Sequence, residues 1–456
     1  MSALCHKLRQ PRIRQPHHFF CGLLLLFFAS MPGTLAQNST AYAVRTESLQ
    51  HQEGPEARSS LQDLLVEAEA NNPQIRAARQ GWDAAKQVPS QVSTLPDPQV
   101  MVQHLSVGSP RPFAGYTTSD FAYIGLGFSQ DIPYPGKLKL RGQVAKRDAD
   151  VAQQQYESVR RSVLAGVKSA YFRLAYLAQT LGILESDGQL LQQVEKAADA
   201  RYRSGMGNQQ DPLQAQVEET KLIREITMHH LEVAKAQAQI KELLNRPQSS
   251  SDVQPAGLPD TPLPYTFDEL LSAAQAQNPE VSGARQMIEK QKLQVDLAHK
   301  DLYPDFSLQY MWQRTDPSQF PAYYMLTFGV HVPIYRSRKQ RPELAQAEAE
   351  LERSRSEAES QSQQVALQLR TAFDVAEKTS ELQRIYKDGL QPQSRAAFQS
   401  GLASYENNRQ DFQALLKSFL DVLQLDEEYW QNLAERETAL AQIEEFSGLS
   451  LREESE

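Results

Sequence analysis

The sequence predicts a mainly α-helical chain with a small β part, arranged as a tandem repeat of long helical hairpins with two strands in each copy. Three observations support this fold class. Short motifs recur in the same order in the two halves of the 456-residue chain. The segment from Lys137 to about Arg203 contains no proline, which permits one very long helix. Four short segments alternate apolar and polar residues, as half-buried strands do.

The first 36 residues have the order of a secretory signal, with a basic start, an apolar core and small residues at a cleavage site. The apolar core is Phe19–Phe28, and Thr34-Leu35-Ala36 supplies the cleavage site. Both cysteines, Cys5 and Cys21, lie within this segment. The mature chain is therefore expected to be exported and held together without disulfides. Cys21 sits early in the apolar run, so lipoprotein processing is not expected.

Composition excludes several classes of protein. The chain has 47 basic and 56 acidic residues, a formal net charge of −9, which argues against nucleic acid as a partner. The mean hydropathy is −0.54. Outside the N-terminus no run of 18 or more apolar residues occurs, so no internal spanning helix is predicted.

A duplication organises the rest of the chain. Its matched motifs include turns and strand positions as well as helical residues, which chance similarity between two Ala/Gln-rich helices does not explain. The matched pairs are Leu64-Leu65 with Leu270-Leu271, Asn72-Pro73 with Asn278-Pro279, Pro96-Asp97 with Pro304-Asp305, Ile132-Pro133 with Val332-Pro333, and Arg203-Ser204-Gly205-Met206 with Gln399-Ser400-Gly401-Leu402.

Each copy has the same expected elements. A short helix, Leu61–Asn71 or Phe267–Gln277, stops at Asn-Pro because the residue before proline avoids the α region. A second helix runs to about Val92 or His299, two strands follow, and then a long helix and a returning helix. The long helix of the first copy carries a coiled-coil spacing of apolar residues, Val163, Val167, Ala170, Leu174, Leu177, Leu181 and Leu184. Its counterpart in the second copy, Pro342–Ala396, is richer in Ala, Gln and Glu.

These elements define the expected domain organisation. Residues 1–36 are a signal peptide, 37–60 an N-terminal linker, 61–245 the first repeat, 246–264 an inter-repeat linker, 265–446 the second repeat and 447–456 an acidic tail.

Alternation along the strands suggests one lipid-facing side. The apolar positions are Ile124, Leu126, Phe128, Phe306, Leu308, Tyr310, Trp312, Tyr324, Leu326, Phe328 and Val330. Gln99–Val107 alternates less well, because His104 stands at one of the even positions, where an apolar residue is expected. Segments of about ten alternating residues are typical of transmembrane β-barrel strands, but a half-buried strand of a soluble sheet alternates in the same way.

Strand number distinguishes these two interpretations. Four strands cannot close a barrel, and an open edge in lipid leaves backbone groups unpaired at a cost of several kcal/mol each. Four strands in a soluble protein would need a covering layer, whereas the flanking sequence offers long helices with narrow apolar stripes. Either the strands close a barrel between subunits, or the membrane interpretation is wrong.

Five segments add to the export signal, the duplicated helix–strand–strand–helix order and the glycine-containing hairpins: Asn72–Ile75, Asn278–Val281, Gln130–Lys137, Ala170–Leu174 and Arg201–Gln216. In this order they resemble the TolC-type outer-membrane efflux family, including its heavy-metal exporter branch. The resemblance implies a homotrimer in which four strands per chain close one 12-stranded barrel. It also implies an α-helical tunnel that extends into the periplasm toward an adaptor (membrane fusion protein) and an inner-membrane pump.

By the same resemblance, Gly205-Met206-Gly207 and Gly401-Leu402-Ala403 are the periplasmic tips that dock the adaptor. Glycine permits the φ > 0 turn that reverses one helix into the next, and an exposed Met or Leu offers an apolar contact. Turn chemistry alone would require the same glycines in any helical hairpin.

The family also places carboxylates just past the tip, where they narrow the entrance. Asp211 matches that place in the first copy, and the second copy departs from it with Glu406, Asn407 and Gln410. A ring of Asp211 side chains in a trimer would favour cations and oppose closure. Asp211 also suits a helix N-terminus by itself, because its charge complements the helix dipole.

No catalytic, cofactor-binding or metal-binding spacing occurs in the sequence, so no cofactor is expected. His229 and His230 are adjacent and point to different helix faces. Met101 and Met311 are interpreted as packing residues rather than copper ligands.

We therefore expect a passive channel, not an enzyme, in the outer membrane of a Gram-negative-type bacterium, with metal cations or drugs as cargo. The alternatives are a periplasmic coiled-coil adaptor or scaffold protein and, less favoured, an exported enzyme. An adaptor should carry a β-rich domain beside one hairpin, whereas this sequence has two hairpins and two strand pairs.

Overall fold

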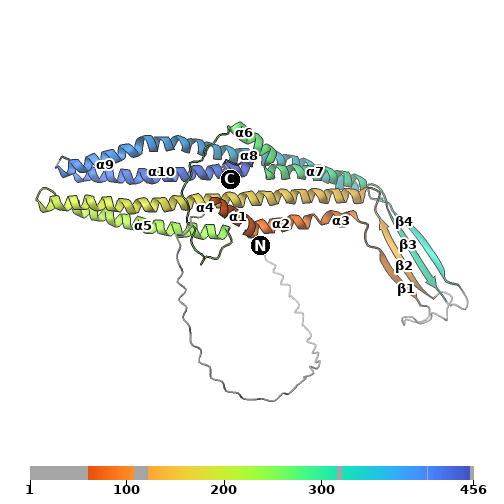
Figure 1. Cartoon of the computed structure of the whole chain (residues 1–456). Coiled ribbons are helices and arrows are strands. Elements are labelled where there is room, and N and C mark those ends of the chain that lie inside the picture. Colours follow the sequence, from red (N-terminus) through yellow and green to blue (C-terminus); the bar gives the residue numbers. More distant parts are fainter. Residues whose placement is uncertain (1–59, 107–121, 316–320, 408, 452–456) are drawn as a thin grey trace, which may run out of the picture. The chain divides into compact units, whose positions relative to one another are not determined.

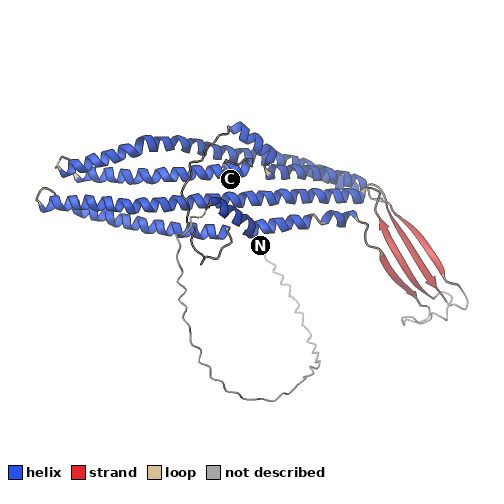
Figure 2. Ribbon diagram, viewed as in Figure 1, coloured by secondary structure: helices blue, strands red, loops and turns tan. Residues whose placement is uncertain are grey.

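The computed structural model describes residues 60–106, 122–315, 321–407 and 409–451, and Figures 1 and 2 show its helices and its single sheet. The predicted signal peptide, nearly all of the N-terminal linker and the end of the acidic tail lie outside these residues. Within them the chain is mainly helical with one four-stranded antiparallel sheet, and its elements repeat in order, which confirms the predicted fold class.

The first copy follows the predicted order with one difference. Its elements are α1 (Leu61–Asn71), α2 (Pro73–Ala85), α3 (Val88–Ser93), β1 (Gln99–Leu105), β2 (Tyr123–Ile132), α4 (Lys137–Arg203) and α5 (Gln210–Leu243). The second helix does not continue to Val92 as expected, because it breaks after Ala85 and restarts as α3. Pro89 stands in the first turn of α3, where its missing N–H costs no hydrogen bond.

The second copy differs from the prediction in its long helix. Its elements are α6 (Phe267–Gln277), α7 (Pro279–Lys300), β3 (Asp305–Arg314), β4 (Tyr323–His331), α8 (Gln340–Ile385), a π turn (Tyr386–Leu390), α9 (Gln391–Glu406) and α10 (Phe412–Ser447). The π turn precedes Pro392, which has no N–H to donate to the carbonyl four residues earlier. The long helix expected over Pro342–Ala396 is therefore two helices joined by a wider turn.

This π turn changes the phase of the buried residues along the helix. On α8 they are spaced by three and four, at Val365, Leu369, Ala372, Ala376, Thr379 and Gln383. On α9 the buried residues are Phe398, Gly401 and Tyr405. Continuing the α8 spacing would bury residues 397, 400 and 404 instead. The π turn thus absorbs one extra residue, as such turns do.

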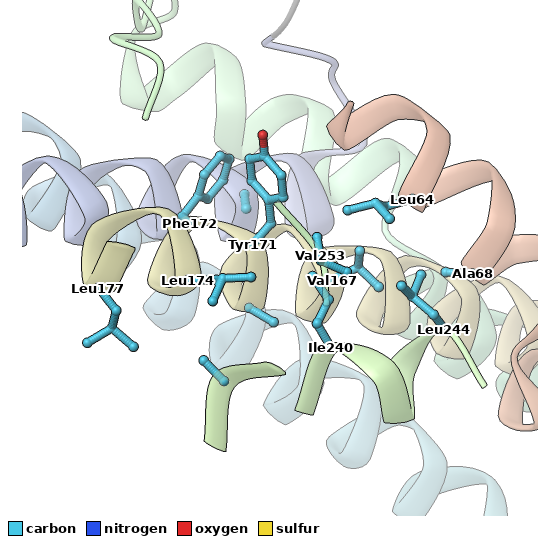
Figure 3. Close-up of a cluster of buried hydrophobic side chains, with 13 residues drawn as sticks. Leu64, Ala68, Val167, Tyr171, Phe172, Leu174, Leu177, Ile240, Leu244 and Val253 are labelled. Carbon is cyan, nitrogen blue, oxygen red and sulfur yellow. The ribbon is translucent and has the colours of Figure 1, made fainter. Parts of the chain in front are cut away.

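Four long helices lie side by side in the order α5, α4, α10 and α8 (Figure 1). The shorter α2 and α3 pack on α4, whereas α7 packs on both α4 and α8. The predicted seam of α4 is buried, apart from the half-buried Leu181. Figure 3 shows the cluster around its middle, where Tyr171 and Leu174 of α4 meet residues of α1, α5 and the inter-repeat segment.

Two asparagines make the same contacts in the two copies. The side-chain oxygen of Asn72 accepts hydrogen bonds from the backbone N–H groups of Gln74 (2.8 Å) and Ile75 (3.3 Å), which caps α2. Its amide group donates to the carbonyl of Leu243 at the end of α5, at 2.8 Å. Asn278 caps α7 in the same way and donates to Phe446 O at 3.1 Å. Each Asn-Pro motif therefore also anchors the end of the returning helix.

The inter-repeat segment is bound to the helices. The carboxylate of Glu437 on α10 accepts hydrogen bonds from the backbone N–H (2.9 Å) and the hydroxyl (2.8 Å) of Thr261. The neighbouring Arg436 donates to the carbonyl of Thr261 at 2.7 Å. Glu437 and Arg436 are both buried. These contacts hold the connection between the copies against the second hairpin.

The sheet joins the helices through a buried lysine. Lys137 is the first residue of α4, and its ammonium group lies 2.9 Å from Asp305 Oδ1 on β3 and 3.0 Å from Asp301 Oδ1 after α7. Asp305 also accepts a hydrogen bond from the backbone N–H of Tyr134, at 2.7 Å. One cation therefore ties the starts of α4 and β3 together. No helix among the described residues is both long and apolar enough to cross a membrane.

Because the two buried asparagines have equivalent contacts, we expect equivalent losses on substitution. Asn72→Ala and Asn278→Ala should each lower the free energy of unfolding by about 2 kcal/mol, since a cap and a buried carbonyl partner are lost together. Thermal melting of the purified protein measures the effect. The control is Asn71→Ala, at an exposed neighbouring position. A loss at only one of the two sites would show that the repeats are not equivalent here.

Candidate functional site: the sheet faces and the hairpin ends

The strand register separates the sheet into two chemically different faces. Val100, Phe128, Tyr310 and Leu326 stand opposite one another across the four strands, and Val102, Leu126, Trp312 and Tyr324 form a second such row. The strand residues predicted to face lipid all lie on this face: Ile124, Leu126, Phe128, Phe306, Leu308, Tyr310, Trp312, Tyr324, Leu326, Phe328 and Val330. The opposite face carries mostly Gln, Ser, Thr, Gly and Met.

Much of the apolar face is exposed in the isolated chain. Its exposed side chains include Val100, Val102, Leu126, Phe128, Tyr310, Trp312, Tyr324, Leu326, Phe328 and Val330. A contiguous apolar patch of this kind marks a surface that something else covers. The strand order β1-β2-β3-β4 also leaves one edge of β1 and one edge of β4 without a partner strand among the described residues.

The outer helices carry exposed apolar residues as well. On α5 these are Leu213, Val217, Ile223, Met228 and Leu231, and on α8 they are Leu367, Val375, Leu382 and Ile385. α5 packs on α4, and α8 packs on α10, α7 and α6. The two edges of the helical layer are therefore apolar, like the exposed face of the sheet.

The first hairpin reverses at the predicted glycines. Gly205 has φ +72°, a left-handed conformation that a residue with a side chain rarely adopts. The N–H of Met206 donates to Arg201 O at 2.9 Å and that of Gly205 to Tyr202 O at 3.0 Å, which is a Schellman motif. At Gly207 a Cβ would lie 3.1 Å from the Cβ of Arg201, so the returning chain passes close to α4. The side chain of Met206 is 60% exposed.

The second hairpin does not reverse at Gly401, contrary to the sequence expectation. Gly401-Leu402-Ala403 lies inside α9, and Gly401 is buried. The equivalent closing bond runs from the N–H of Arg409 to Ser404 O, at 2.9 Å, about two helical turns further along. A Cβ at Gly401 would lie 3.3 Å from the Gln410 amide nitrogen. This glycine therefore permits close packing of the returning segment and makes no turn.

Arg201 and Tyr405 link the two hairpin ends. The guanidinium of Arg201, on α4, lies 4.2 Å from the ring centroid of Tyr405, on α9. It also donates to Tyr405 O at 2.9 Å and to Met206 O at 3.1 Å. The hydroxyl of Tyr405 donates to Asp211 Oδ2, on α5, at 3.1 Å. We name this set the Arg201–Tyr405–Asp211 contact.

Burial, followed by the nearby Asp211 carboxylate, raises the pKa of Tyr405 to about 12, with Arg201 opposing the shift. Tyr405 is fully buried, so its hydroxyl stays protonated at neutral pH and acts as a donor to Asp211. The pair Gln214 and Gln413 adds reciprocal amide hydrogen bonds between the same two hairpins.

The other predicted entrance residues lie around this contact. Glu406 ends α9 and is exposed, as is Asn407, whose side chain donates to Ala403 O at 2.7 Å. Gln410 is half-buried and lines a groove of about 660 Å³ with Asp211, Met206 and Arg409. Of the predicted set, Asp211 is the residue that bonds to the neighbouring hairpin. Sequence reasoning missed Arg201 and Tyr405, although both stand within a few residues of the predicted turns.

A second contact between the hairpins contains two buried carboxyl groups. Asp187 of α4 is 6% exposed, and its Oδ2 has no hydrogen-bond partner. Asp426 of α10 accepts hydrogen bonds from Gln391 (2.8 Å) and Arg395 (2.7 Å). Burial and then the negative charge of Asp426 raise the pKa of Asp187 to about 6. Both carboxyl groups line a cavity of about 760 Å³.

The sheet with one apolar face, borne by paired helical hairpins, defines a class of protein: channels of outer membranes that carry helical extensions. The chain belongs to the outer membrane efflux protein family, whose model matches residues 64–246 and 270–444. The two matched segments correspond to the two copies, and the resemblance stated from the sequence is confirmed.

Solved structures have the same fold at low sequence identity. The outer-membrane channel OprN aligns with a TM-score of 0.73 and 18% identity over 86% of this chain and 90% of its own. VceC, an outer membrane protein of Vibrio cholerae, aligns with a TM-score of 0.72 and 15% identity over 86% and 97%. CusC, described as forming a transmembrane channel, gives 0.73 and 16% over 86% and 93%. A search of curated proteins found no match.

Asp187 predicts an unusual dependence of stability on pH. Its folded pKa of about 6 lies above the ordinary value of 3.8, so the folded state binds more protons between these values. Stability should therefore fall as pH rises from about 4 to about 6, and stay lower above that window. Asp187→Asn should raise the free energy of unfolding at pH 7.5 by roughly 1–3 kcal/mol, with a smaller gain at pH 4.5.

Thermal melting at the two pH values measures this effect. Glu185→Gln, at an exposed position on the same helix, is the matched control and should change little. A loss of stability in Asp187→Asn at pH 7.5 would contradict the assignment of a destabilising buried charge.

Proposed function

We propose that the protein is a passive conduit of the outer membrane, assembled as a homotrimer in which four strands per chain close one twelve-stranded barrel. The observation that carries the proposal is a sheet with one apolar face, one polar face and two free edges. Unpaired backbone groups in hydrocarbon cost several kcal/mol each, so β1 of one subunit pairs with β4 of the next. The apolar face then meets lipid and the polar face lines the pore.

The helical layer supports the same closure. In the proposed trimer the apolar residues of α5 pack against those of α8 in the neighbouring subunit, which removes both exposed edges from water. The resulting tunnel extends from the barrel into the periplasm. The conduit binds no nucleotide and supplies no energy, so an inner-membrane pump and a periplasmic adaptor deliver the cargo, which is metal cations or drugs.

The hairpin ends are the proposed adaptor-docking tips. Gly205-Met206-Gly207 presents an exposed methionine on a compact turn. In the second hairpin, Gly401 is buried, Leu402 half-buried and Ala403 exposed, so this tip offers less apolar surface. The first tip is therefore expected to contribute more to docking.

The Arg201–Tyr405–Asp211 contact is the proposed entrance closure. It fixes the second hairpin to the first through a stacked ring and two hydrogen bonds. In the trimer three copies of Asp211 would face the tunnel entrance, with Glu406, Asn407 and Gln410 nearby. Opening requires these hairpins to separate, and the carboxylates would then favour entry of cations.

The conduit and its docking tip can be tested in one experiment. A photocrosslinking amino acid replaces Met206, and membranes of exporting cells are irradiated and then washed with carbonate. We expect the chain to remain in the outer membrane, to migrate as a trimer before heating, and to crosslink to a periplasmic adaptor.

Recovery as a soluble monomer would refute the barrel. A washed trimer with no crosslink would refute docking at Met206 alone. The same replacement at Ile223, on the α5 surface that the proposed trimer buries, is the control and should crosslink to the neighbouring subunit instead of the adaptor.

Weakening the Arg201–Tyr405–Asp211 contact should open the entrance. Tyr405→Phe keeps the stacked ring but removes the hydrogen bond to a carboxylate, a loss of roughly 1.5–3 kcal/mol. The open population in single-channel recordings of the purified trimer should rise about tenfold or more. Asp211→Asn should also lower cation preference, which a reversal potential measures. Tyr202→Phe, an exposed tyrosine near the same turn, is the control. An unchanged open population in Tyr405→Phe would rule out a role in closure.

A further inference from the structure

The polar face of the sheet contains a row of methionines. The register places Met101 opposite Gly127, Gly127 opposite Met311, and Met311 opposite Met325, so one row crosses all four strands. The whole chain has eight methionines, and three of them stand in this row. The sequence interpretation considered Met101 and Met311 separately, as packing residues. Their alignment with Met325 could not be seen without the strand pairing. We name these residues the methionine row.

Two of the thioether side chains meet above the single glycine of the row. A Cβ built on Gly127 would lie 2.6 Å from Met311 Cε, 2.9 Å from Met311 Sδ and 3.0 Å from Met101 Cγ. The side chains from β1 and β3 therefore both lean over β2 and occupy the space that the missing side chain leaves. Met311 is fully buried, whereas Met325 is 45% exposed. Met101 is half-buried, so the row contains one covered thioether, one partly covered and one accessible.

The surroundings of the methionine row are polar. The adjacent rows on the same face are Gln99, Ser129, Gln309 and Thr327 on one side, and Gln103, Gly125, Gln313 and Tyr323 on the other. Neither contains an aliphatic side chain, and most of the large apolar residues of these strands lie on the opposite face, although Leu105 and Tyr123 form the next row on this face. The side-chain amide of Gln309 donates to Met101 Sδ at 3.3 Å, which orients that sulfur within the row. Apolar packing alone does not account for three thioethers in such a wall.

Thioether sulfur is a soft, neutral ligand. Soft ligands select soft metal ions such as Cu(I), whereas carboxylates and waters suit Mg²⁺, Ca²⁺ and Mn²⁺. Among the described residues no group of three or more His, Cys, Asp or Glu side chains could hold a metal ion, so the row does not belong to such a cluster. Its ligand chemistry therefore points to a soft monovalent cation.

We propose that the methionine row binds soft monovalent cations, Cu⁺ or Ag⁺, with Met101 and Met311 as the principal ligands and Met325 as the accessible one. Binding involves no change of oxidation state. In the proposed trimer, on which this step rests, the polar face lines the pore and the row repeats three times around the barrel wall at one level. Soft cations are then a cargo that the wall itself recognises.

Silver binding to the purified full-length protein tests the proposal. Ag⁺ in chloride-free nitrate buffer is titrated calorimetrically into the wild type and into the variant carrying Met101→Leu and Met311→Leu, substitutions that nearly conserve volume. We expect the affinity of the wild type for Ag⁺ to fall at least tenfold in the double variant. Met325→Leu, at an exposed position, should weaken binding less. Met228→Leu and Met287→Leu, both on helices, are matched controls and should bind as the wild type does.

Trimer formation and single-channel conductance are measured on the same samples. Unchanged silver affinity in the double variant overturns the metal site, whatever the conductance. Weakened silver binding in a double variant whose trimers still conduct supports the site as separate from the barrel. The wild type could also bind silver through the methionine row and yet show no channel activity. That result would support the metal site and refute the conduit. If the double variant fails to form trimers, equal silver affinity in Met325→Leu and the wild type overturns the proposal.

Discussion

The backbone N–H and C=O groups along the free edges of β1 and β4 impose the main constraint on this protein. A sheet with one apolar face is stable in lipid only when every such group is paired, and four strands cannot bend far enough to pair with themselves. The apolar outer surfaces of α5 and α8 present the same incompleteness in the helical layer. The sheet and the helical layer thus both expose surfaces that a neighbouring subunit would cover. The contact of Lys137 with Asp305 couples the two layers where α4 meets the sheet.

The two copies share the contacts that anchor their helices but differ at the hairpin ends, where function is expected. Asn72 and Asn278 each cap one helix and hold the end of another, so the two copies agree in their scaffold. The hairpin ends differ: the first reverses on Gly205 in a left-handed conformation, and the second continues past Gly401. The Arg201–Tyr405–Asp211 contact joins residues of both copies, so neither hairpin could form it alone.

Local chemistry made much of the fold predictable from the sequence. The ends of α1 and α6 follow from the Asn-Pro motifs, and the length of α4 follows from the absence of interior proline. Alternation identified the apolar strand face because strand periodicity is two. Arg201 and Tyr405 were missed because their contact joins positions 204 residues apart. Strand pairing is equally non-local, so alternation could not align Met101 with Met311 and Met325. Gly401 was misplaced because a glycine within a packed helix looks, in sequence, like one in a turn.

The π turn at Tyr386–Leu390 has a consequence for the entrance. Each residue of an α-helix advances its side chain by about 100° around the axis. Without the widened turn, the buried stripe of α8 would continue into α9 one position earlier, and the aromatic ring of Tyr405 would be rotated away from α4 by that angle. Arg201 would then find no π surface to stack on, and Asp211 no phenol. One extra residue, about four helical turns before Tyr405, therefore sets the angular alignment on which the Arg201–Tyr405–Asp211 contact depends.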